Sequence, residues 1–391
     1  MDKQHYDVIV VGGGLVGMAC ALSLSQHGIS VALIESKPSS KIMESQAVVW
    51  DSRIYAITPA NVDWLRQLGV WPRVDAARVC AITKMRVFGD AEVSELQFDG
   101  DDVNIEQLGV IVESQQLEMA LLAALNNSSV QLLTGVQPTS VAFSDYQACI
   151  QCNNQEISAQ LLVAADGAQS WLRSEAEIAV TQHDYKQIGV VANFETEFPH
   201  QKTAYQWFSD LGVLAWLPLP GNRISMVWSA EESFAQALAS MDAHTLCEVV
   251  SNQGGNTLGE LRLLTPARAF PLKEQTAETL VMSSIALVGD AAHTIHPLAG
   301  QGVNLGFRDV QFLVEVLSHK RPQQSFGDLM LLRRYERARK TDMMAMKFVT
   351  RGLSELFSLD HPAVKKLRNW GLNFTNRQTF ARKYLTRQAT R

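Results

Sequence analysis

Residues 289–306 read GDAAHTIHPLAGQGVNLG. The apolar run from Ile285 to Val288 just before them predicts a buried strand, and the apolar spacing from Val303 to Leu317 predicts a helix. Asp290 then stands at the carboxyl end of a strand, which is where open α/β sheets bind their ligands. The stretch therefore predicts a strand, a ligand-binding loop and a helix in immediate succession.

The glycines of this stretch suit a bound group that is flat or charged. Gly300, Gly302 and Gly306 carry no side chain, so the backbone can approach a ligand closely. The amide groups at a helix start stabilise negative charge, such as that on the pyrimidine edge of a reduced flavin ring. These residues alone predict a cofactor cradle.

A second glycine-rich turn stands near the N-terminus. Tyr6 to Val11 predicts a buried strand, GGGLVG follows at 12–17 with a helix to about Gln26, and a second strand over Ser30–Ile34 ends in Glu35. This is the βαβ pattern of dinucleotide binding. The alternative, a glycine-rich turn without a ligand, does not account for the strands, the helix and the acid together.

Each element of that pattern has a physical task. Gly12 permits the tight turn, Gly14 lets a pyrophosphate approach the helix start, and Gly17 lets helix and strand pack closely. Glu35 stands about where an acid binds the adenosine ribose hydroxyls. An NAD-dependent dehydrogenase would leave residues 289–306 unexplained, so the cofactor predicted from both stretches is FAD.

The same residues carry a family resemblance. Residues 289–306 resemble the third signature of class A flavoprotein monooxygenases with the para-hydroxybenzoate hydroxylase fold, and their wording is similar to that of the ubiquinone-biosynthesis hydroxylases within that superfamily. ADGAQSWLR, at 165–173, resembles the middle signature, and the segment from Arg53 to Ile57 resembles an R-x-x-A-I stretch. The resemblance runs from about residue 6 to residue 375.

The resemblance implies roles for particular residues. Asp290 would hold the ribityl chain, and the amides of Gly302, Val303 and Asn304 would face the pyrimidine edge of the flavin. Arg53 would lie near the FAD phosphates or the ring, with a surface salt bridge as the alternative. Asp166 would serve the pyrophosphate region and a transient nicotinamide site, and it can also cap the following helix.

The active site is expected between the cofactor and a second sheet. Its lining residues are predicted to include Pro297, His296 and Trp216; the catalytic base is unknown. Aromatic residues on the strands from about 178 to 266 would suit an aromatic substrate, although each of them could equally be an ordinary core residue. These aromatic residues are Trp207, Phe208, Trp216 and Trp228.

The expected fold class is α/β, with a Rossmann-like FAD-binding domain, a mixed β-sheet substrate domain and C-terminal helices. The FAD-binding domain is predicted in three parts, at 1–76, 104–177 and 268–342. The substrate domain comprises a hairpin at 77–103 and a sheet at 178–267. A helical basic tail is predicted at 343–391.

The resemblance also implies the reaction. NAD(P)H or another reductant reduces FAD, dioxygen adds to form a flavin C4a-hydroperoxide, and one oxygen atom passes to an electron-rich aromatic ring. The leading hypothesis for the substrate is a polyprenylated phenol or quinol of ubiquinone biosynthesis. One alternative is a class A hydroxylase of a small soluble aromatic acid; another is a non-catalytic, flavin-bearing scaffold of a ubiquinone-synthesis complex.

Composition limits the remaining functions. The chain has 391 residues and a net charge of −6, which gives no overall attraction to nucleic acid. Five cysteines argue against a disulfide framework, and a C-x-x-C at Cys149 and Cys152 falls on a predicted strand that points the two side chains to opposite faces. His293 and His296 have no companions at metal-ligand spacing, so no metal is predicted.

The C-terminal segment differs in charge from the rest. From 361 to 391 it holds eight basic residues and no acidic one. With the apolar positions of 345–372, this segment predicts either peripheral contact with a membrane or a multiprotein complex, or a helix packed on the body. No transmembrane segment is evident, and the expected location is cytoplasmic, with contact at the inner membrane surface as a further hypothesis.

Overall fold

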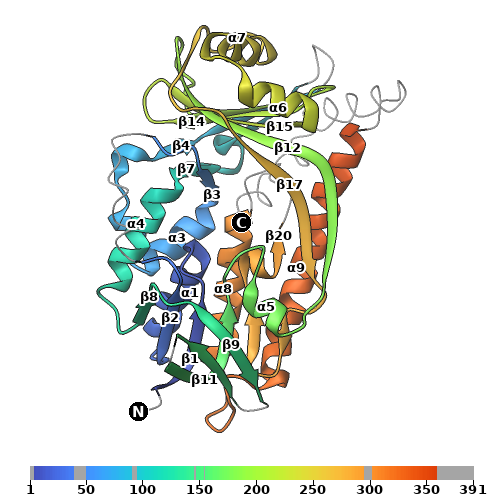
Figure 1. Cartoon of the computed structure of the whole chain (residues 1–391). Helices are drawn as coiled ribbons and strands as arrows, with labels where there is room; N and C mark the ends of the chain where they lie inside the picture. Colours follow the sequence, from blue (N-terminus) through green and yellow to red (C-terminus); the bar gives the residue numbers. More distant parts are fainter. Residues whose placement is uncertain are drawn as a thin grey trace.

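The computed structural model describes residues 4–38, 50–89, 95–144, 147–153, 155–294 and 302–358, with the side chains of 103 and 344–358 excepted. The chain forms two large sheets, a small three-stranded sheet between them, and helices that pack against each (Figure 1). The expected α/β class, with a Rossmann-like part and a second mixed sheet, is confirmed.

The first sheet is the Rossmann-like one. Its order is β18-β19-β11-β1-β2-β8, with β10 paired to β11 and β9 to β10. Strands β19, β11, β1, β2 and β8 run parallel. Residues 8–11 of β1, 31–34 of β2, 161–164 of β11 and all of β19 are buried, whereas the residues of β8 at the end of this order are half-buried or exposed. Its strands are β1 Gln4–Val11, β2 Val31–Glu35, β8 Gln131–Thr134, β9 Pro138–Phe143, β10 Ala148–Cys152, β11 Gln155–Ala164, β18 Val281–Met282 and β19 Ile285–Leu287.

The helices of this part begin where the sequence pattern places them. α1 follows the glycine turn and packs against both α4 and α8, while α9 packs on α8. The helices of the described residues are α1 Leu15–Gln26, α3 Pro59–Gln67, α4 Ser114–Leu125, α5 Trp171–Glu175, α6 Glu232–Ser240, α7 Ala243–Gln253, α8 Gly302–Ser318 and α9 Leu329–Ser358, with short 3-10 turns η1 Trp71–Arg73, η2 Ala76–Arg78, η3 Gly100–Val103 and η4 Gly289–Ala291.

The second sheet has the order β20-β17-β12-β15-β14-β13-β5-β6, with β16 paired to β12. Helices α6 and α7 cover one of its faces at the top of the molecule (Figure 1). Its strands are β5 Lys84–Phe88, β6 Glu95–Asp99, β12 Val180–Thr196, β13 Thr203–Ser209, β14 Gly212–Leu219, β15 Arg223–Glu231, β16 Leu261–Leu263, β17 Arg268–Ala277 and β20 His293–Thr294.

Two long strands connect the two halves. β12 and β17 pair along most of their length and run from the upper sheet down to β20 and the first sheet (Figure 1). The small sheet, β3 Ile54–Ile57, β7 Gly109–Glu113 and β4 Cys80–Ile82, lies between the halves. Its Ile111 packs with Leu219 of the upper sheet, while Val110 and Val112 belong to the lower core.

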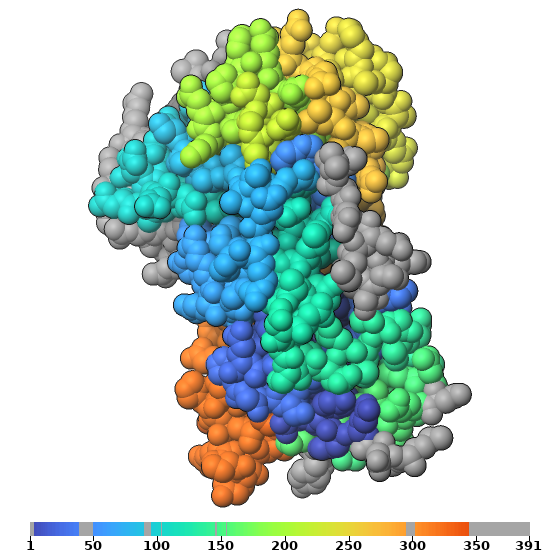
Figure 2. All heavy atoms as spheres, turned by 90° about the vertical axis from the view of Figure 1, so that its left-hand side faces the viewer, coloured from blue at the N-terminus to red at the C-terminus, as the bar shows by residue number. Residues whose placement is uncertain are grey.

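The surface shows the same division. In Figure 2 the green to orange residues of the second sheet form an upper lobe above the blue and teal segments of the first. The hairpin β5–β6 joins the upper sheet through parallel pairing of β5 with β13. The predicted segment boundaries between the two domains stay predictions.

Candidate functional site

The N-terminal glycines occupy three different environments. Gly12 has a φ of +108°, and a Cβ there would lie 2.4 Å from the Ala165 carbonyl oxygen. A Cβ on Gly17 would lie 1.9 Å from the Gly12 carbonyl oxygen, so the helix can rest on the turn only without a side chain. A Cβ on Gly14 would meet nothing within 4 Å. Gly14 thus faces open space at the start of α1.

Glu35 lies at the end of β2 beside this turn. Its carboxylate accepts hydrogen bonds from the Gly13 amide at 2.6 Å and from the Lys37 amide at 2.8 Å. The side chain is half-buried. The carboxylate is thus held next to the start of α1, and its binding of the adenosine ribose stays a prediction.

The N-terminal glycine turn and residues 289–306 meet at one side chain. Val16, in the first turn of α1, lies against both Gly289 and Gly306: a Cβ on either glycine would approach it within 3.2 Å and 2.6 Å, respectively. Gly289 also has a positive φ, +59°. The turn that carries Asp290 and the helix α8 can therefore close around α1 only because both positions lack a side chain.

Asp290 lies in the short turn η4 after β19. Its side chain is exposed, yet the protein around it raises the pKa of its carboxyl by desolvation, against the opposing effects of His293 and Arg53. The oxygens of Asp290 are therefore open to a ligand although protein atoms surround much of the carboxyl. We call the surroundings of Asp290 and Arg53 the cofactor recess.

Arg53 belongs to the same recess. Its pKa is raised first by Tyr55 and further by Glu118 and Asp290, so it stays a cation beside these groups. The guanidinium lies 5.7 Å from the centroid of the Tyr55 ring. Arg53 pairs with no carboxylate among the ion pairs of the described residues, which does not favour the alternative of a surface salt bridge.

Three neighbours of Arg53 were absent from the sequence-based site. The Ser114 amide donates to the Arg53 carbonyl at 2.9 Å, and the Ser114 hydroxyl donates to Glu118 at 2.9 Å. Burial raises the pKa of the Tyr55 phenol, and Arg53 and Ser114 oppose that shift. The start of α4 therefore lies beside the backbone of Arg53.

Asp166 follows β11, next to the first glycine turn. One carboxylate oxygen accepts from the Leu172 amide at 3.0 Å, which is the helix-capping role. The other oxygen, Oδ1, is buried and has no hydrogen-bond partner among the residues that the structure describes. Since a buried carboxylate oxygen without a donor is costly, this atom fits a site that a ligand completes.

The start of α8 holds amides whose role toward the flavin stays a prediction, and it has a second role in the packing of the site. Gly302 faces open space, and the first-turn amides of Gly302, Val303 and Asn304 have no carbonyl partner within the helix. The Asn304 side chain is buried and accepts from the Thr58 amide at 3.0 Å, while it donates to the Ala56 carbonyl at 2.7 Å. Asn304 therefore fastens α8 to the segment that follows Arg53.

The aromatic wall predicted for the chamber faces the wrong way. Trp216 is fully buried in the core between the upper sheet and helices α6 and α7, and a Cβ on Gly254 at the end of α7 would lie 2.1 Å from its ring. Trp207 and Trp228 share that core, while Phe208 packs on the opposite face with Val87. The prediction that Trp216 lines the active site is thus wrong. Side chains alternate between the two faces of β14, and Trp216 lies on the face that the helices cover.

The other face of the upper sheet is turned toward the FAD-binding part. Asn193 of β12 donates to the Asp51 carbonyl at 2.9 Å, which fixes that orientation. By alternation, the residues on this side include a cross-strand row, Val191, Val227 and Ala215, all half-buried. These residues replace the tryptophans as the wall of the expected chamber.

Two predicted lining residues, His296 and Pro297, lie outside the described residues. Of the C-x-x-C pair, Cys149 is half-buried and Cys152 buried, and burial raises the pKa of the Cys152 thiol to about 11.

A cavity of about 790 Å³ opens on the flank between the segment 66–81 and the turns at 199–202 and 220–221. No residue predicted to bind FAD lines this cavity, so the cofactor recess is separate from it.

The geometry fits FAD. Gly14 and Gly302 leave open space at two helix starts, Glu35 lies beside the first, and Asp290 and Arg53 share a recess. The unpartnered Asp166 Oδ1 lies in the same region. Fold and site together define a flavin-binding oxidoreductase. The cofactor roles of the individual residues stay predictions.

Comparisons with known proteins agree. The family described as FAD binding domain matches residues 5–350. The chain is 35% identical over 377 residues to the 3-demethoxyubiquinol 3-hydroxylase of Escherichia coli (strain K12), covering 95% of each chain. It is 32% identical to the ubiquinone hydroxylase UbiL of Rhodospirillum rubrum (98% of this chain, 89% of UbiL) and 30% identical to the mitochondrial ubiquinone biosynthesis monooxygenase COQ6 of Caenorhabditis elegans (96% and 93%).

Solved structures share the fold at low identity. The p-nitrophenol 4-monooxygenase PnpA from Pseudomonas putida DLL-E4 matches with a TM-score of 0.79 at 15% identity, covering 99% of this chain and 98% of PnpA. HpxO of Klebsiella pneumoniae, complexed with FAD and uric acid, matches with a TM-score of 0.73 at 17% identity over 98% and 97%. The chain therefore belongs to the FAD-dependent monooxygenases of the ubiquinone-biosynthesis hydroxylase family.

Proposed function

We propose that this enzyme hydroxylates the aromatic ring of a polyprenylated phenol or quinol intermediate in ubiquinone biosynthesis. The support is the similarity along nearly the whole chain to relatives named for ubiquinone and demethoxyubiquinol hydroxylation. The observation that carries the substrate class is the half-buried apolar row Val191, Val227 and Ala215 on the sheet face turned toward the cofactor part. Such a row suits an uncharged ring with a hydrocarbon chain.

Bound FAD supplies the oxygen-transfer chemistry, using dioxygen and electrons from NAD(P)H or another reductant. The residues of the chain bind and orient it. Asp290 would hold the ribityl hydroxyls, the first amides of α8 would face the pyrimidine edge, and Glu35 would hold the adenosine ribose. The apolar face of the upper sheet would exclude water from the reacting ring.

The alternative, a hydroxylase of a small aromatic acid, has one residue in its favour. Arg268 pairs with Val191 across β17 and β12, so it ends the apolar row, and its side chain is exposed. It would be the cation for a substrate carboxylate. Arg268→Gln should leave kcat/KM for a prenylated phenol within about twofold, whereas an enzyme of a small acid should lose most of its kcat/KM.

The pathway itself is tested by the quinone intermediates of cells that lack this gene. Mass spectrometry of lipid extracts should show one accumulated prenylated phenol that lacks a single hydroxyl, which also names the ring position. Several such intermediates would indicate an enzyme of broad regioselectivity. A normal ubiquinone profile, without a second gene that compensates, would contradict the proposed function.

We also propose that the enzyme contacts a membrane surface or a ubiquinone-synthesis complex through its C-terminal segment. The support is the charge of 361–391, with eight basic residues and no acidic one, and the nature of the substrate. The segment beyond residue 358 lies outside the described residues. Among the helices that the structure does describe, none has the length and apolar character to cross a bilayer.

Truncation after Phe357 should therefore weaken binding to vesicles that contain anionic lipid, or to the other proteins of the pathway, while FAD stays bound. The measurement is vesicle cosedimentation alongside the flavin absorbance of the truncated protein. Unchanged cosedimentation would rule out this role for the segment, and loss of FAD would show instead that it packs on the body.

A further inference from the structure

A buried charge lies beneath the recess that holds Asp290. Asp309, in the middle of α8, is fully buried, and its carboxylate accepts three hydrogen bonds. The donors are the Gly289 amide at 2.8 Å, the His293 Nε2 at 2.7 Å and the Arg339 Nε at 2.7 Å. None of the roles described above uses this carboxylate, although a buried ion is costly unless its partners are well placed.

Two of the three contacts bracket Asp290. Gly289 precedes Asp290 and His293 follows it by three residues, and both donate to the same oxygen, Oδ2 of Asp309. The Asp309 carboxylate thus closes the turn η4 from below and leaves the side chain of Asp290 exposed on the other side. A substitution of Asp309 would therefore shift both ends of the turn that orients the Asp290 side chain.

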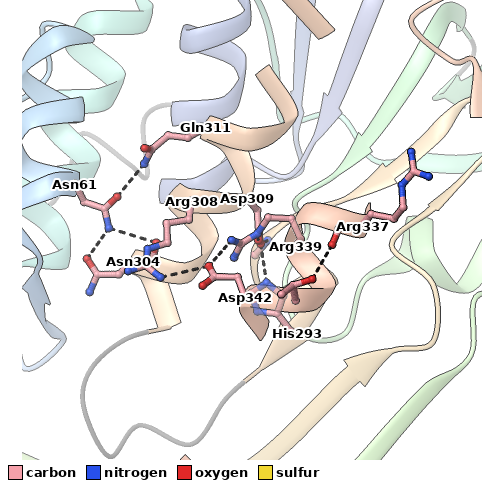
Figure 3. A network of polar contacts seen from close by, with 11 residues as sticks. Asn61, His293, Asn304, Arg308, Asp309, Gln311, Arg337, Arg339 and Asp342 are labelled. Carbon is pink, nitrogen blue, oxygen red and sulfur yellow. Dashed lines mark hydrogen bonds and ion pairs between the residues drawn. The ribbon is translucent and has the colours of Figure 1, made fainter. Parts of the chain in front are cut away.

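The other oxygen of Asp309 is held by α9. Arg339 is fully buried, donates to Oδ1 of Asp309, and reaches Asp342 Oδ2 with its Nη1 at 2.6 Å. Arg308 lies 3.3 Å from the same Asp342 oxygen. Figure 3 shows the chain of contacts from His293 through Asp309 and Arg339 to Asp342. Asp342 lies at the outer end of this network, with 37% of its side chain exposed, and its ion pairs are with Arg308 and Arg339.

The opposite side of α8 is fixed as well. The Asn304 side chain bonds to the Thr58 amide and to Asn61, close behind the strand that follows Arg53 (Figure 3). Positions 304 and 309 are about 140° apart around a helix, so the two side chains reach in different directions. α8 therefore connects the segment of Arg53 on one side with the turn of Asp290 on the other.

The charge on Asp309 matters to this arrangement. Burial alone would raise the pKa of its carboxyl, but His293, Arg339 and the Gly289 amide outweigh burial and hold that pKa below its usual range. An ionised carboxylate has lone pairs for three donors, whereas a neutral amide presents its own N–H groups to one of them. Asparagine of equal size is therefore a poor substitute.

We propose that Asp309 is a positioning residue for the cofactor. It orients the Asp290 carboxylate toward the ribityl chain of FAD, and Arg339 of α9 fixes the position of Asp309. The two residues act through the turn η4 and not by touching FAD. The affinity for FAD then depends on a helix, α9, whose contact with the cofactor turn runs through a buried ion pair.

The test is the FAD dissociation constant of folded apoprotein, measured by quenching of flavin fluorescence without any substrate. Asp309→Asn should raise that constant on the order of tenfold or more, as is usual when a residue that orients a ligand-binding group is removed. The matched control is Asp342→Asn, which changes the same network at its exposed end. Its dissociation constant should stay within about twofold of the wild type.

A second pair covers the case in which Asp309→Asn does not fold. His293→Gln keeps a donor for Asp309 and should retain the wild-type absorbance spectrum of bound flavin, whereas His293→Leu removes the donor and should weaken FAD binding and alter that spectrum. Lower thermal stability with wild-type FAD affinity in both Asp309→Asn and His293→Leu would show a purely structural network. Equal losses in Asp342→Asn and Asp309→Asn would place the effect in α9 packing and overturn the proposal. These measurements of FAD affinity and of thermal stability need no substrate.

Discussion

Gly14 and Gly17 stand three positions apart in one turn, but the structure assigns them separate tasks. A side chain on Gly14 would enter open space, and its φ of −73° suits any residue. A side chain on Gly17 would collide with the Gly12 carbonyl. One glycine leaves room for the cofactor, and the other lets the fold close.

We therefore expect Gly14→Ala to leave the stability of the apoprotein unchanged and to raise the FAD dissociation constant by at least roughly tenfold, or ~1.4 kcal/mol. Gly17→Ala should lower the free energy of unfolding of the apoprotein by about 1–3 kcal/mol, because an overpacked site must shift its backbone. Urea unfolding of apoprotein and FAD titration separate the two effects. Equal FAD affinity in Gly14→Ala and the wild type would remove Gly14 from the cofactor site.

Asp290 gives a pH-dependent prediction. Because its carboxyl has a raised pKa in the folded protein, the folded state binds a proton more tightly than the unfolded state does. This residue then makes the apoprotein less stable as the pH rises from the usual aspartate range to the raised pKa. Asp290→Asn should remove that contribution, making the apoprotein more stable at neutral pH while FAD binds more weakly.

The measurement is urea unfolding of apoprotein from pH 4 to pH 8, with and without the substitution. The difference in stability between Asp290→Asn and the wild type should grow as the pH rises through that window. A difference that is independent of pH would mean that the carboxyl of Asp290 ionises as an ordinary aspartate does.

Single residues were predictable from the sequence where their task is carried out by neighbours in the chain. Gly12, Gly14, Gly17 and Glu35 lie within one βαβ unit, so their spacing predicted their relative places. Asp309 was missed because its partners, Gly289, His293 and Arg339, come from a turn and from another helix. A signal was available: an aspartate inside an apolar helical run is buried only if it is paired.

At the level of elements, β14 shows where sequence patterns give too little information. Its residues Leu214 to Leu219 are all apolar, so alternation could not tell the two faces of the strand apart. The face of Trp216 is decided by helices α6 and α7, which pack on it. Neighbouring Ala215 faces the FAD-binding part instead.

This orientation predicts opposite effects at two adjacent positions. Trp216→Ala should lower the free energy of unfolding by ~3–5 kcal/mol, because it empties a core site, with KM of the surviving folded enzyme little changed. Ala215→Leu should leave stability within about 0.5 kcal/mol and raise KM for the aromatic substrate. Chemical unfolding and steady-state kinetics measure both. A change in KM for Trp216→Ala together with full stability would return Trp216 to the chamber wall.

Across the whole molecule, the cofactor site is assembled from segments far apart in the chain. Val16 fits between Gly289 and Gly306, Asn304 binds the segment of Thr58, and Arg173 of α5 donates to the Ala291 carbonyl at 2.9 Å. The sequence predicted the α/β class and the strand and helix around residues 289–306, since those follow from local periodicity and motif order. It could not predict these long-range contacts, which depend on how helices α1, α5 and α8 pack.

The central claim is that this chain, with FAD bound, inserts one oxygen atom into the ring of a prenylated phenol or quinol. Its most direct test is turnover of such a substrate by purified, FAD-loaded enzyme and a reductant under ¹⁸O₂, followed by mass spectrometry of the product. We expect one ¹⁸O atom in a new ring hydroxyl. Reduction of oxygen to hydrogen peroxide without labelled product, together with labelled product from a small aromatic acid, would contradict the claim.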